Sequence, residues 1–310
     1  MEQLPPLGRI IPQVLPRTSE IYGLILDKNS KQEILGTARE TFTYGSHKRQ
    51  QLDLYTPSKP AGKEPRPLLI FLYGGGFING EKVLSRIPGG LVYTNLGYYF
   101  AEKVGFDTII PDYRLNGDGG AFPSGAEDIS GVLDWVQKKF AAQQGKPVYL
   151  MGNSAGGVHL AGWLLADQFK SSREPSITGE SNIKIAGVIT LGSLMNFVGA
   201  PPPLVSVLRE HFGEGYENLS PIALLKKAVK NGALVGKWPR LLVLYSELDP
   251  QDIIKSNIEF LEELERSGLA ADHFILQGHN HISPPMALGT GIATEEVWGE
   301  RVVAWCKNSS

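Results

Sequence analysis

The chain has 310 residues, of which 42% are hydrophobic and 20% charged, and its formal net charge is −2 at pH 7. This length allows one large α/β domain or two small ones, and the composition is ordinary for a globular protein with a large core. The near-neutral charge gives no reason to expect nucleic acid or an anionic membrane surface as a partner.

The sequence also bounds the compartment. No uninterrupted apolar run reaches the roughly 18 residues that a membrane span needs, and prolines and charges interrupt the first 20 residues. We therefore expect no transmembrane segment and no signal peptide. Cys306 is the only cysteine, which excludes an intrachain disulfide and fits a reducing compartment. We expect a cytoplasmic protein, and a homodimer is left open.

Two stretches stand outside the predicted core. Residues 1–39 are rich in proline at first and then have the pattern of an amphipathic helix, which carries Ile21, Leu24, Ile25 and Leu26. Residues 193–238 interrupt the strand–helix alternation for longer than a simple crossover needs. The core is predicted to be formed by residues 40–192 and 239–310.

Eight short segments have the composition of β-strands. They are Glu40–Tyr44, Gln51–Tyr55, Leu68–Tyr73, Asp107–Tyr113, Pro147–Met151, Ile185–Leu191, Arg240–Tyr245 and Asp272–Leu276. The first two alternate apolar and polar positions and predict an antiparallel edge hairpin. The others are continuous and apolar, which is typical of parallel strands covered on both faces. The sequence therefore predicts an α/β fold with a doubly wound, mostly parallel eight-stranded sheet and helices on both faces.

Two helices between the later strands have a clear apolar periodicity. The first is expected to bury one face formed by Ile129, Val132, Leu133, Val136 and Phe140. The second is expected to bury Ile254, Ile258, Leu261 and Leu264 and to end before Gly268.

A glycine-rich turn follows the third predicted strand, with the sequence Gly74-Gly75-Gly76-Phe77. Such a turn leaves backbone N–H groups free to converge on one point, as a tetrahedral intermediate with an oxyanion requires. A phosphate cradle is the alternative for a glycine-rich turn, but no Gly-Lys-Ser/Thr follows. We expect the N–H groups of Gly75 and Gly76 to be oxyanion donors.

The most informative motif is Gly152-Asn153-Ser154-Ala155-Gly156. It follows an apolar strand and precedes a helix-compatible segment, which is the context of a nucleophile elbow. A sharp turn of this kind excludes flanking side chains, so glycines on both sides of the serine are expected. Ser154 is the candidate nucleophile, and the N–H of Ala155 is the third candidate oxyanion donor.

These motifs together resemble those of the α/β-hydrolases, in particular the hormone-sensitive-lipase-like esterases and the kynurenine formamidase-like enzymes. The resemblance spans roughly residues 40 to 305 and also includes Asp112-Tyr113-Arg114-Leu115, Phe122-Pro123-Ser124 and Asp249-Pro250. It implies an α/β-hydrolase fold in which residues 1–39 and 193–238 pack together as a helical cap. Two departures concern substrate preference: Tyr73 stands where the family has histidine, and the usual Pro-Glu-His-x-Phe-Pro stretch is reduced.

Ser154 needs a histidine base and an acid to assist it. In this order of motifs the acid follows the serine in the sequence, and the histidine follows the acid. Asp249 lies just after a predicted strand and is the candidate acid, with Asp252 as the alternative. Asp112 is expected to have a structural role, paired with Arg114 or with backbone donors.

Of the six histidines, His279 and His281 lie in the loop after the last predicted strand. The resemblance favours His281 as the base, with His279 as the alternative. A metal site formed by this pair is disfavoured because no further ligands lie nearby. We expect His273 and His159 to be structural.

The sequence thus predicts a serine hydrolase that cleaves a carboxylic ester of a small, fairly apolar substrate and uses no metal or cofactor. Tyr73 and Phe77 are candidate substrate-binding residues, and for Tyr73 bracing of the glycine turn is favoured over a hydrogen bond beside the pocket. An amidase or formamidase, a lactonase and a thioester hydrolase remain alternatives with the same triad. A non-catalytic small-molecule receptor on the same fold is the alternative from another class.

Overall fold

The fold is organised around one eight-stranded sheet, with strand order β1-β2-β4-β3-β5-β6-β7-β8. The structure, a computed structural model, describes residues 1–60, 62, 64–232, 234 and 237–308. The strands are β1 (Arg39–Thr43), β2 (Gln51–Tyr55), β3 (Leu68–Leu72), β4 (Asp107–Pro111), β5 (Lys146–Asn153), β6 (Ile183–Leu191), β7 (Leu241–Leu248) and β8 (Asp272–Asn280). All eight predicted strands are present, with small shifts at their ends.

The pairing of the strands confirms the predicted topology. β1 and β2 form an antiparallel hairpin at the edge, and β2 is also antiparallel to β4. The remaining neighbours are all parallel. β3 and β5 lie side by side, with Leu72 paired to Gly152, so the two glycine-rich turns leave the sheet next to each other at its carboxyl edge. Ligands of doubly wound sheets bind at this edge.

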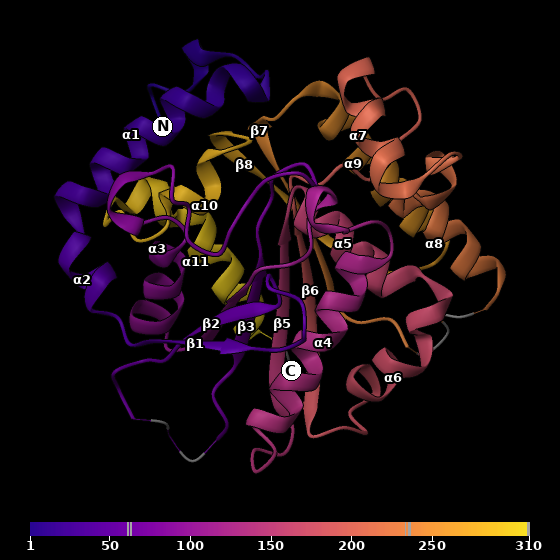
Figure 1. Ribbon diagram of the computed structural model, residues 1–310, viewed down its shortest axis with the longest axis horizontal. Helices are drawn as coiled ribbons and strands as arrows, with labels where there is room; N and C mark the ends of the chain where they lie inside the picture. The colour runs from indigo at the N-terminus through magenta and orange to yellow at the C-terminus, as the bar shows by residue number, and fades with distance from the viewer. Residues whose placement is uncertain (61, 63, 233, 235–236, 309–310) are drawn as a thin grey trace.

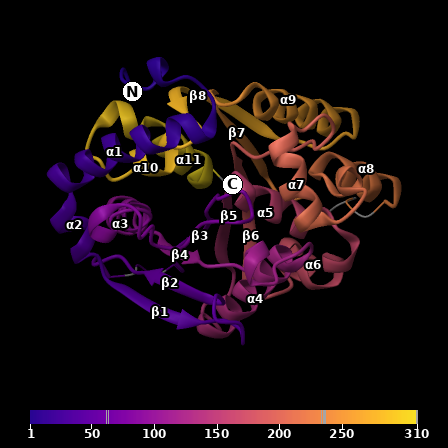
Figure 2. The same ribbon diagram turned by 45° about the horizontal axis from the view of Figure 1, so that its top comes forward.

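Helices cover both faces of the sheet (Figures 1 and 2). One face carries α3 (Thr94–Tyr98), the π-helical turn η3 (Tyr99–Val104), α10 (Ser283–Ala287) and α11 (Ala293–Lys307). The other face carries α4 (Ser124–Lys139), α5 (Ala155–Leu165), α6 (Lys170–Thr178), α8 (Pro221–Lys230) and α9 (Gln251–Arg266). The predicted α/β fold with helices on both faces is therefore confirmed.

The remaining helices lie near the carboxyl edge of the sheet or at its margins. They are α1 (Ile11–Asn29), α2 (Lys31–Gly36) and α7 (Pro202–Phe212). Short 3₁₀ turns complete the chain: η1 (Pro5–Leu7), η2 (Pro88–Gly90), η4 (Asn116–Asp118), η5 (Asp167–Phe169) and η6 (Tyr216–Leu219).

The apolar face predicted for α4 is confirmed, since all five of its residues are buried. The face predicted for α9 is confirmed in part. Leu264 is buried and Leu261 packs against the core, whereas Ile258 is 43% exposed. Ile253, Ser256, Asn257 and Phe260 are also buried. Polar side chains occupy the buried face because they bind the backbone after β6: Asn257 donates to the carbonyl of Ser193, and Ser256 Oγ accepts from the N–H of Met195. Periodicity of apolar residues alone does not reveal such a face.

The amphipathic helix expected in the first stretch is α1, but its buried face differs from the predicted one. Val14, Thr18, Tyr22 and Leu26 are buried, whereas Leu24 is 65% exposed. The buried residues are spaced by four, so they form one stripe along the helix. This stripe packs toward α10, the helix that follows the last strand.

The helices of the two stretches outside the core lie on opposite sides of the carboxyl edge (Figures 1 and 2). α1 packs on α2 and α10, whereas α7 packs on η6, and α8 on α5 and α9. The expectation that the two stretches form a cap stays a prediction. Residues 233 and 235–236 of the second stretch, and residues 309–310 of the predicted core, lie outside the described residues.

Candidate active site

Ser154 lies at the turn between β5 and α5. Its backbone has φ 51° and ψ −121°, a conformation that a residue with a side chain rarely adopts. The flanking glycines make the turn sterically feasible. A Cβ on Gly152 would lie 2.5 Å from Gly157 Cα, and one on Gly156 would lie 2.3 Å from the carbonyl oxygen of Leu72. The turn thus holds the Ser154 hydroxyl beside the N-terminus of α5.

His281 contacts both Ser154 and Asp249. Its Nε2 lies 3.0 Å from Ser154 Oγ, and its Nδ1 lies 2.6 Å from Asp249 Oδ1. The three residues come from the ends of β5, β7 and β8, which are far apart in the sequence. A hydroxyl, an imidazole and a carboxylate in this order can transfer a proton away from the hydroxyl.

The Asp249 carboxylate is fully buried and is fixed from the other side as well. Its Oδ2 accepts a hydrogen bond of 2.6 Å from the N–H of Ser246. Arg9, before α1, donates to the carbonyls of Glu247 and Asp249 and so ties the N-terminal stretch to this loop. The alternative acid, Asp252, lies in the first turn of α9, and the carboxylate beside His281 is that of Asp249.

The loop that carries His281 is held by Asn280. The Asn280 side chain accepts from the N–H groups of Ile282 and Ser283 and donates to Thr18 Oγ1 of α1. The alternative base, His279, points elsewhere: its Nδ1 lies 2.9 Å from Ser283 Oγ, and burial lowers its pKa to about 4. Of the two candidate histidines, the structure brings only His281 to Ser154.

The glycine-rich turn after β3 lies against the serine. A Cβ on Gly74 would be 2.9 Å from Ser154 Cβ. Gly75, Gly76 and Phe77 all have positive φ, at 143°, 61° and 67°, so the turn has an unusual backbone that exposes its amides. Within the described part of the chain, the N–H groups of Gly75 and Gly76 donate to no backbone acceptor. The N–H of Ala155, the first residue of α5, has no partner inside the helix either.

Tyr73 does not face the cleft, which corrects its assignment as a substrate-binding residue. Its side chain is fully buried, and its hydroxyl donates to Asp112 Oδ1 at 2.7 Å. Its ring stacks on Tyr93 and Tyr113. Such a packed, hydrogen-bonded ring braces the glycine turn from below. This is the role that the sequence favoured for Tyr73.

Asp112 was expected to pair with Arg114 or with backbone donors, and the structure shows a backbone donor and not Arg114. Its Oδ1 accepts from the N–H of Lys82 as well as from Tyr73. Arg114 binds Asp128 and Glu127 instead. Burial raises the pKa of the Asp112 carboxyl.

Comparisons with known proteins agree with this geometry. The BD-FAE family matches residues 52–204. A probable isoprenylcysteine alpha-carbonyl methylesterase of Arabidopsis thaliana is 28% identical over 278 residues, which cover 84% of this chain and 55% of that protein. The chain spans little more than half the length of this plant relative. An esterase of the archaeon Pyrobaculum calidifontis shares 19% identity over 96% of this chain and 93% of its own, with a TM-score of 0.64. Esterase B of Lactobacillus rhamnosis shares 15% identity over 94% of each chain, with a TM-score of 0.65.

The solved structures show that the chain has the α/β-hydrolase fold that the resemblance implied, and these relatives and neighbours are named as esterases.

In this α/β-hydrolase, an apolar wall stands beside the glycine turn. Phe77 is packed with Ala155 and Val158 of the core and with residues of the second stretch outside the core, among them Phe197, Leu208, Phe212 and Tyr216. The Phe77 ring stacks on His211 of α7, with ring centroids 4.5 Å apart. Phe77, a candidate substrate-binding residue, thus connects the glycine turn to α7.

Two buried histidines flank this wall. His159 of α5 and His211 of α7 lie edge to face, with centroids 5.2 Å apart. His211 Nδ1 lies 2.7 Å from Asn116 Oδ1, and burial lowers the pKa of His211 to about 4. Burial and the neighbouring His211 lower the pKa of His159 well below its usual value. The expected structural role of His159 fits this position, whereas His211 gave no signal in the sequence.

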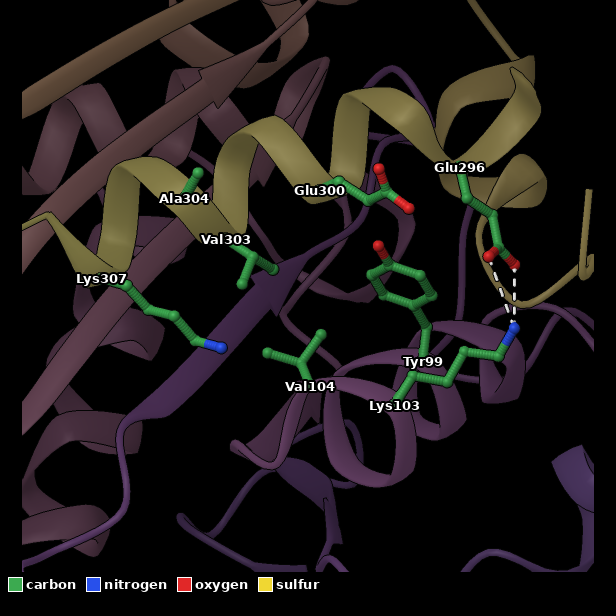
Figure 3. A pocket seen from close by; sticks show the side chains of 8 residues that line it. All are labelled: Tyr99, Lys103, Val104, Glu296, Glu300, Val303, Ala304 and Lys307. Atoms are coloured by element: carbon green, nitrogen blue, oxygen red, sulfur yellow. Dashed lines mark hydrogen bonds and ion pairs between the residues drawn. The ribbon is translucent and has the colours of Figure 1, made fainter. Parts of the chain in front are cut away.

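A hollow of about 380 Å³ lies on the opposite face of the sheet from α5 (Figure 3). It is lined by η3 and α11, neither of which carries a triad residue. Lys103 and Glu296 form an ion pair across it at 3.4 Å. The hollow is separate from the site around Ser154.

The described residues offer neither a membrane span nor a metal site. No helix among them is long and apolar enough to cross a membrane. In the same part of the chain, no group of three or more histidine, cysteine, aspartate or glutamate side chains is arranged to hold a metal ion.

Proposed function

We propose that the protein is a serine hydrolase that cleaves a carboxylic ester of a small, fairly apolar substrate through an acyl-enzyme intermediate. The observation that carries this proposal is the continuous chain of contacts from Asp249 through His281 to Ser154. It lies beside the N–H groups of Gly75, Gly76 and Ala155, which donate to no backbone acceptor among the residues that the structure describes.

In the proposed reaction, His281 Nε2 accepts the proton of Ser154 Oγ as this oxygen attacks the carbonyl carbon of the ester. The carbonyl oxygen becomes an oxyanion, which the N–H groups of Gly75, Gly76 and Ala155 stabilise. The ester bond then breaks, and His281 gives its proton to the departing alcohol. Water attacks the acyl-enzyme in turn, loses a proton to His281 and releases the carboxylic acid, and Ser154 recovers its proton.

Asp249 is proposed to orient the base and to stabilise the imidazolium. Its Oδ1 accepts the Nδ1–H of His281, which leaves Nε2 as the acceptor that faces Ser154. The Ser246 N–H on the other carboxylate oxygen keeps the acid in place. A carboxylate held in this way keeps the imidazole in one tautomer.

The proposed substrate class rests on the apolar wall and on the relatives. Phe77 and Phe212 belong to a packed apolar cluster next to the glycine turn, and the partly buried Leu194, Leu204 and Val207 lie against it, so the surroundings of Ser154 on this side are apolar. The plant relatives are named as methylesterases of an isoprenylcysteine carbonyl, and an ester with a short alcohol and an apolar acyl part suits this chain. Residues 1–39 and 193–238 are proposed to form a cap in two parts, which flank the site and limit the access of water. A cytoplasmic location remains part of the proposal.

The proposal is tested with Ser154→Ala and a panel of p-nitrophenyl esters. The variant should lose hydrolysis of p-nitrophenyl acetate while it keeps the thermal unfolding profile of the parent. Normal turnover by Ser154→Ala would show that another group does the chemistry. The same panel, extended to formyl-anilides, lactones and thioesters, distinguishes the ester from the amide, lactone and thioester alternatives. One structural neighbour is a putative thioesterase, which makes the thioester arm worth including.

A receptor on this fold is distinguished by covalent labelling. A fluorophosphonate probe reacts with an activated serine, so Ser154 should be labelled in the parent protein and not in Ser154→Ala. A parent protein that binds apolar esters without labelling or turnover would favour the receptor.

A further inference from the structure

One arginine outside the triad joins both ends of the turn that carries the proposed oxyanion donors. We define the oxyanion loop as residues 73–80. Arg49 lies between β1 and β2, the two strands of the edge hairpin. Its Nη2 donates to the hydroxyl of Tyr73, at the start of the loop, and to the carbonyl of Gly80, at its end, both at 2.8 Å.

The same guanidinium also binds the segment after β4. Arg49 Nε donates to the carbonyl of Tyr113 at 2.7 Å, and Nη2 lies 3.7 Å from Asp112 Oδ1. Asp112 in turn accepts from the Tyr73 hydroxyl, and the Tyr113 hydroxyl donates to the carbonyl of Tyr73. Arg49 is therefore the centre of a network that fixes the oxyanion loop to a second strand end.

The loop has little room to adjust if this network is broken. Gly80 has φ 118°, and a Cβ there would lie 2.5 Å from the ring of Tyr73. At the other side, Gly74 lies so close to Ser154 that a Cβ would be 2.9 Å from Ser154 Cβ. A displacement at Tyr73 or Gly80 is thus expected to move the amides of Gly75 and Gly76 relative to the serine.

We propose that Arg49 is a positioning residue for the oxyanion hole, an inference that rests on the function proposed for Ser154. Its planar fork presents several N–H donors at fixed angles, which suits three oxygens on two different segments. A lysine ammonium at this position could not make the same set of contacts. Because oxyanion donors act only when they are held in place beforehand, Arg49 contributes to the rate without touching the substrate.

The test compares Arg49→Ala and Arg49→Lys with Lys48→Ala. Lys48 is the neighbouring cation, its side chain is 75% exposed, and it pairs with Asp118 rather than with the loop. The readouts are kcat and KM for p-nitrophenyl acetate and the inhibition constant of an alkyl trifluoromethyl ketone, whose serine adduct carries an oxyanion. Loss of one oxyanion donor costs about 10²–10³ in kcat, so a displaced loop should cost roughly 10–100-fold.

Arg49→Ala is expected to lower kcat by this factor, to leave KM within about twofold and to weaken the ketone in proportion, as a group that acts only in the transition state does. Added methylguanidinium should restore part of kcat. Arg49→Lys, which keeps the charge and most of the packed stem, should stay impaired, and Lys48→Ala should match the parent.

Two results would overturn the inference. One is parental kcat and ketone affinity in Arg49→Lys, which remains measurable even if Arg49→Ala does not fold. The other is a fall in melting temperature without any change in kcat. A parent protein that neither hydrolyses esters nor reacts with a fluorophosphonate would overturn the proposed function itself, and it is recognised before any variant is compared.

Discussion

Alanine substitutions at the adjacent Gly75 and Gly76 should have different effects on kcat, because an added Cβ clashes with the oxyanion loop at only one of the two positions. Gly75 has φ 143°, and a Cβ there would lie 1.9 Å from the carbonyl oxygen of Asn79. That is more than 1 Å inside the closest approach that a real Cβ makes to a carbonyl oxygen. Gly76 has φ 61°, and a Cβ there meets no heavy atom within 4 Å.

Gly75→Ala must therefore open the loop, whose own hydrogen bonds run from the N–H groups of Ile78 and Asn79 to the Gly75 carbonyl. Loss of a single oxyanion donor costs about 10²–10³ in kcat, or roughly 2.7–4 kcal/mol, and this variant should lose at least that much. Gly76→Ala should pay mainly the left-handed backbone cost of about 1–2 kcal/mol in stability, with kcat within roughly fivefold of the parent because no atom need move.

The assay is the hydrolysis of p-nitrophenyl acetate, whose small acyl group keeps contact with an added methyl to a minimum. Thermal unfolding of each variant is measured alongside. Equal losses of kcat in the two variants, or a Gly75→Ala enzyme with parental kcat, would refute the reasoning. Equal losses of kcat would mean that any side chain is harmful at both positions, and that the clash with Asn79 does not explain the effect at Gly75.

Three further predictions address the acid, the buried histidines and the sheet. Asp249→Asn should lower kcat by about 10⁴, since the amide favours the wrong tautomer of His281; Asp252→Asn is the control for steady-state kinetics, and similar losses in both would contradict the assignment. Burial lowers the pKa values of His211 and His279 to about 4 from 6.5, so the stability due to each neutral ring is complete above pH 6.5 and is lost as pH falls toward 4. The free energy of unfolding in urea should be lower at pH 4.5 than at pH 7 by a loss approaching about 3 kcal/mol per histidine. If the free energy of unfolding of His211→Gln depended on pH as steeply as that of the parent, the result would argue against this explanation. Lys146→Met should lower the free energy of unfolding, because Asp107 loses its partner at 2.7 Å, but by less than the roughly 3–5 kcal/mol of a buried charge left unpaired, because Arg66 stays at 3.8 Å. The kcat measured at low temperature should stay parental, and an unchanged melting temperature in calorimetry would refute the prediction.

The local features of the fold could be predicted because they depend on short segments of sequence. A buried parallel strand is a short apolar run, and α4 is an apolar stripe with helical spacing, so both are visible in a single window. The two glycine turns were equally visible because each is a short glycine-rich motif that follows an apolar run. A Cβ on Gly152 would clash with α5, and one on Gly156 would clash with β3.

Features that depend on long-range partners were predicted less well. The buried face of α9 includes Ser256 and Asn257 because these side chains bind the backbone after β6, so an apolar pattern led to Ile258 instead. The partners of Tyr73, Asp112 and Arg49, could not be predicted because they come from segments far away in the sequence. His211 gave no sequence signal, since its stacking on Phe77 depends on where α7 docks.

The sequence by itself determined the strand–helix alternation, the two glycine turns and the short set of residues able to supply a nucleophile, a base and an acid. Only the tertiary structure decided which histidine reaches Ser154, which side chains brace the oxyanion loop, and that α1 and α7 flank the site from opposite sides. The reason is physical: backbone conformation is governed by neighbours in the chain, whereas a hydrogen bond between the ends of β5 and β8 exists only once strand order and register are set.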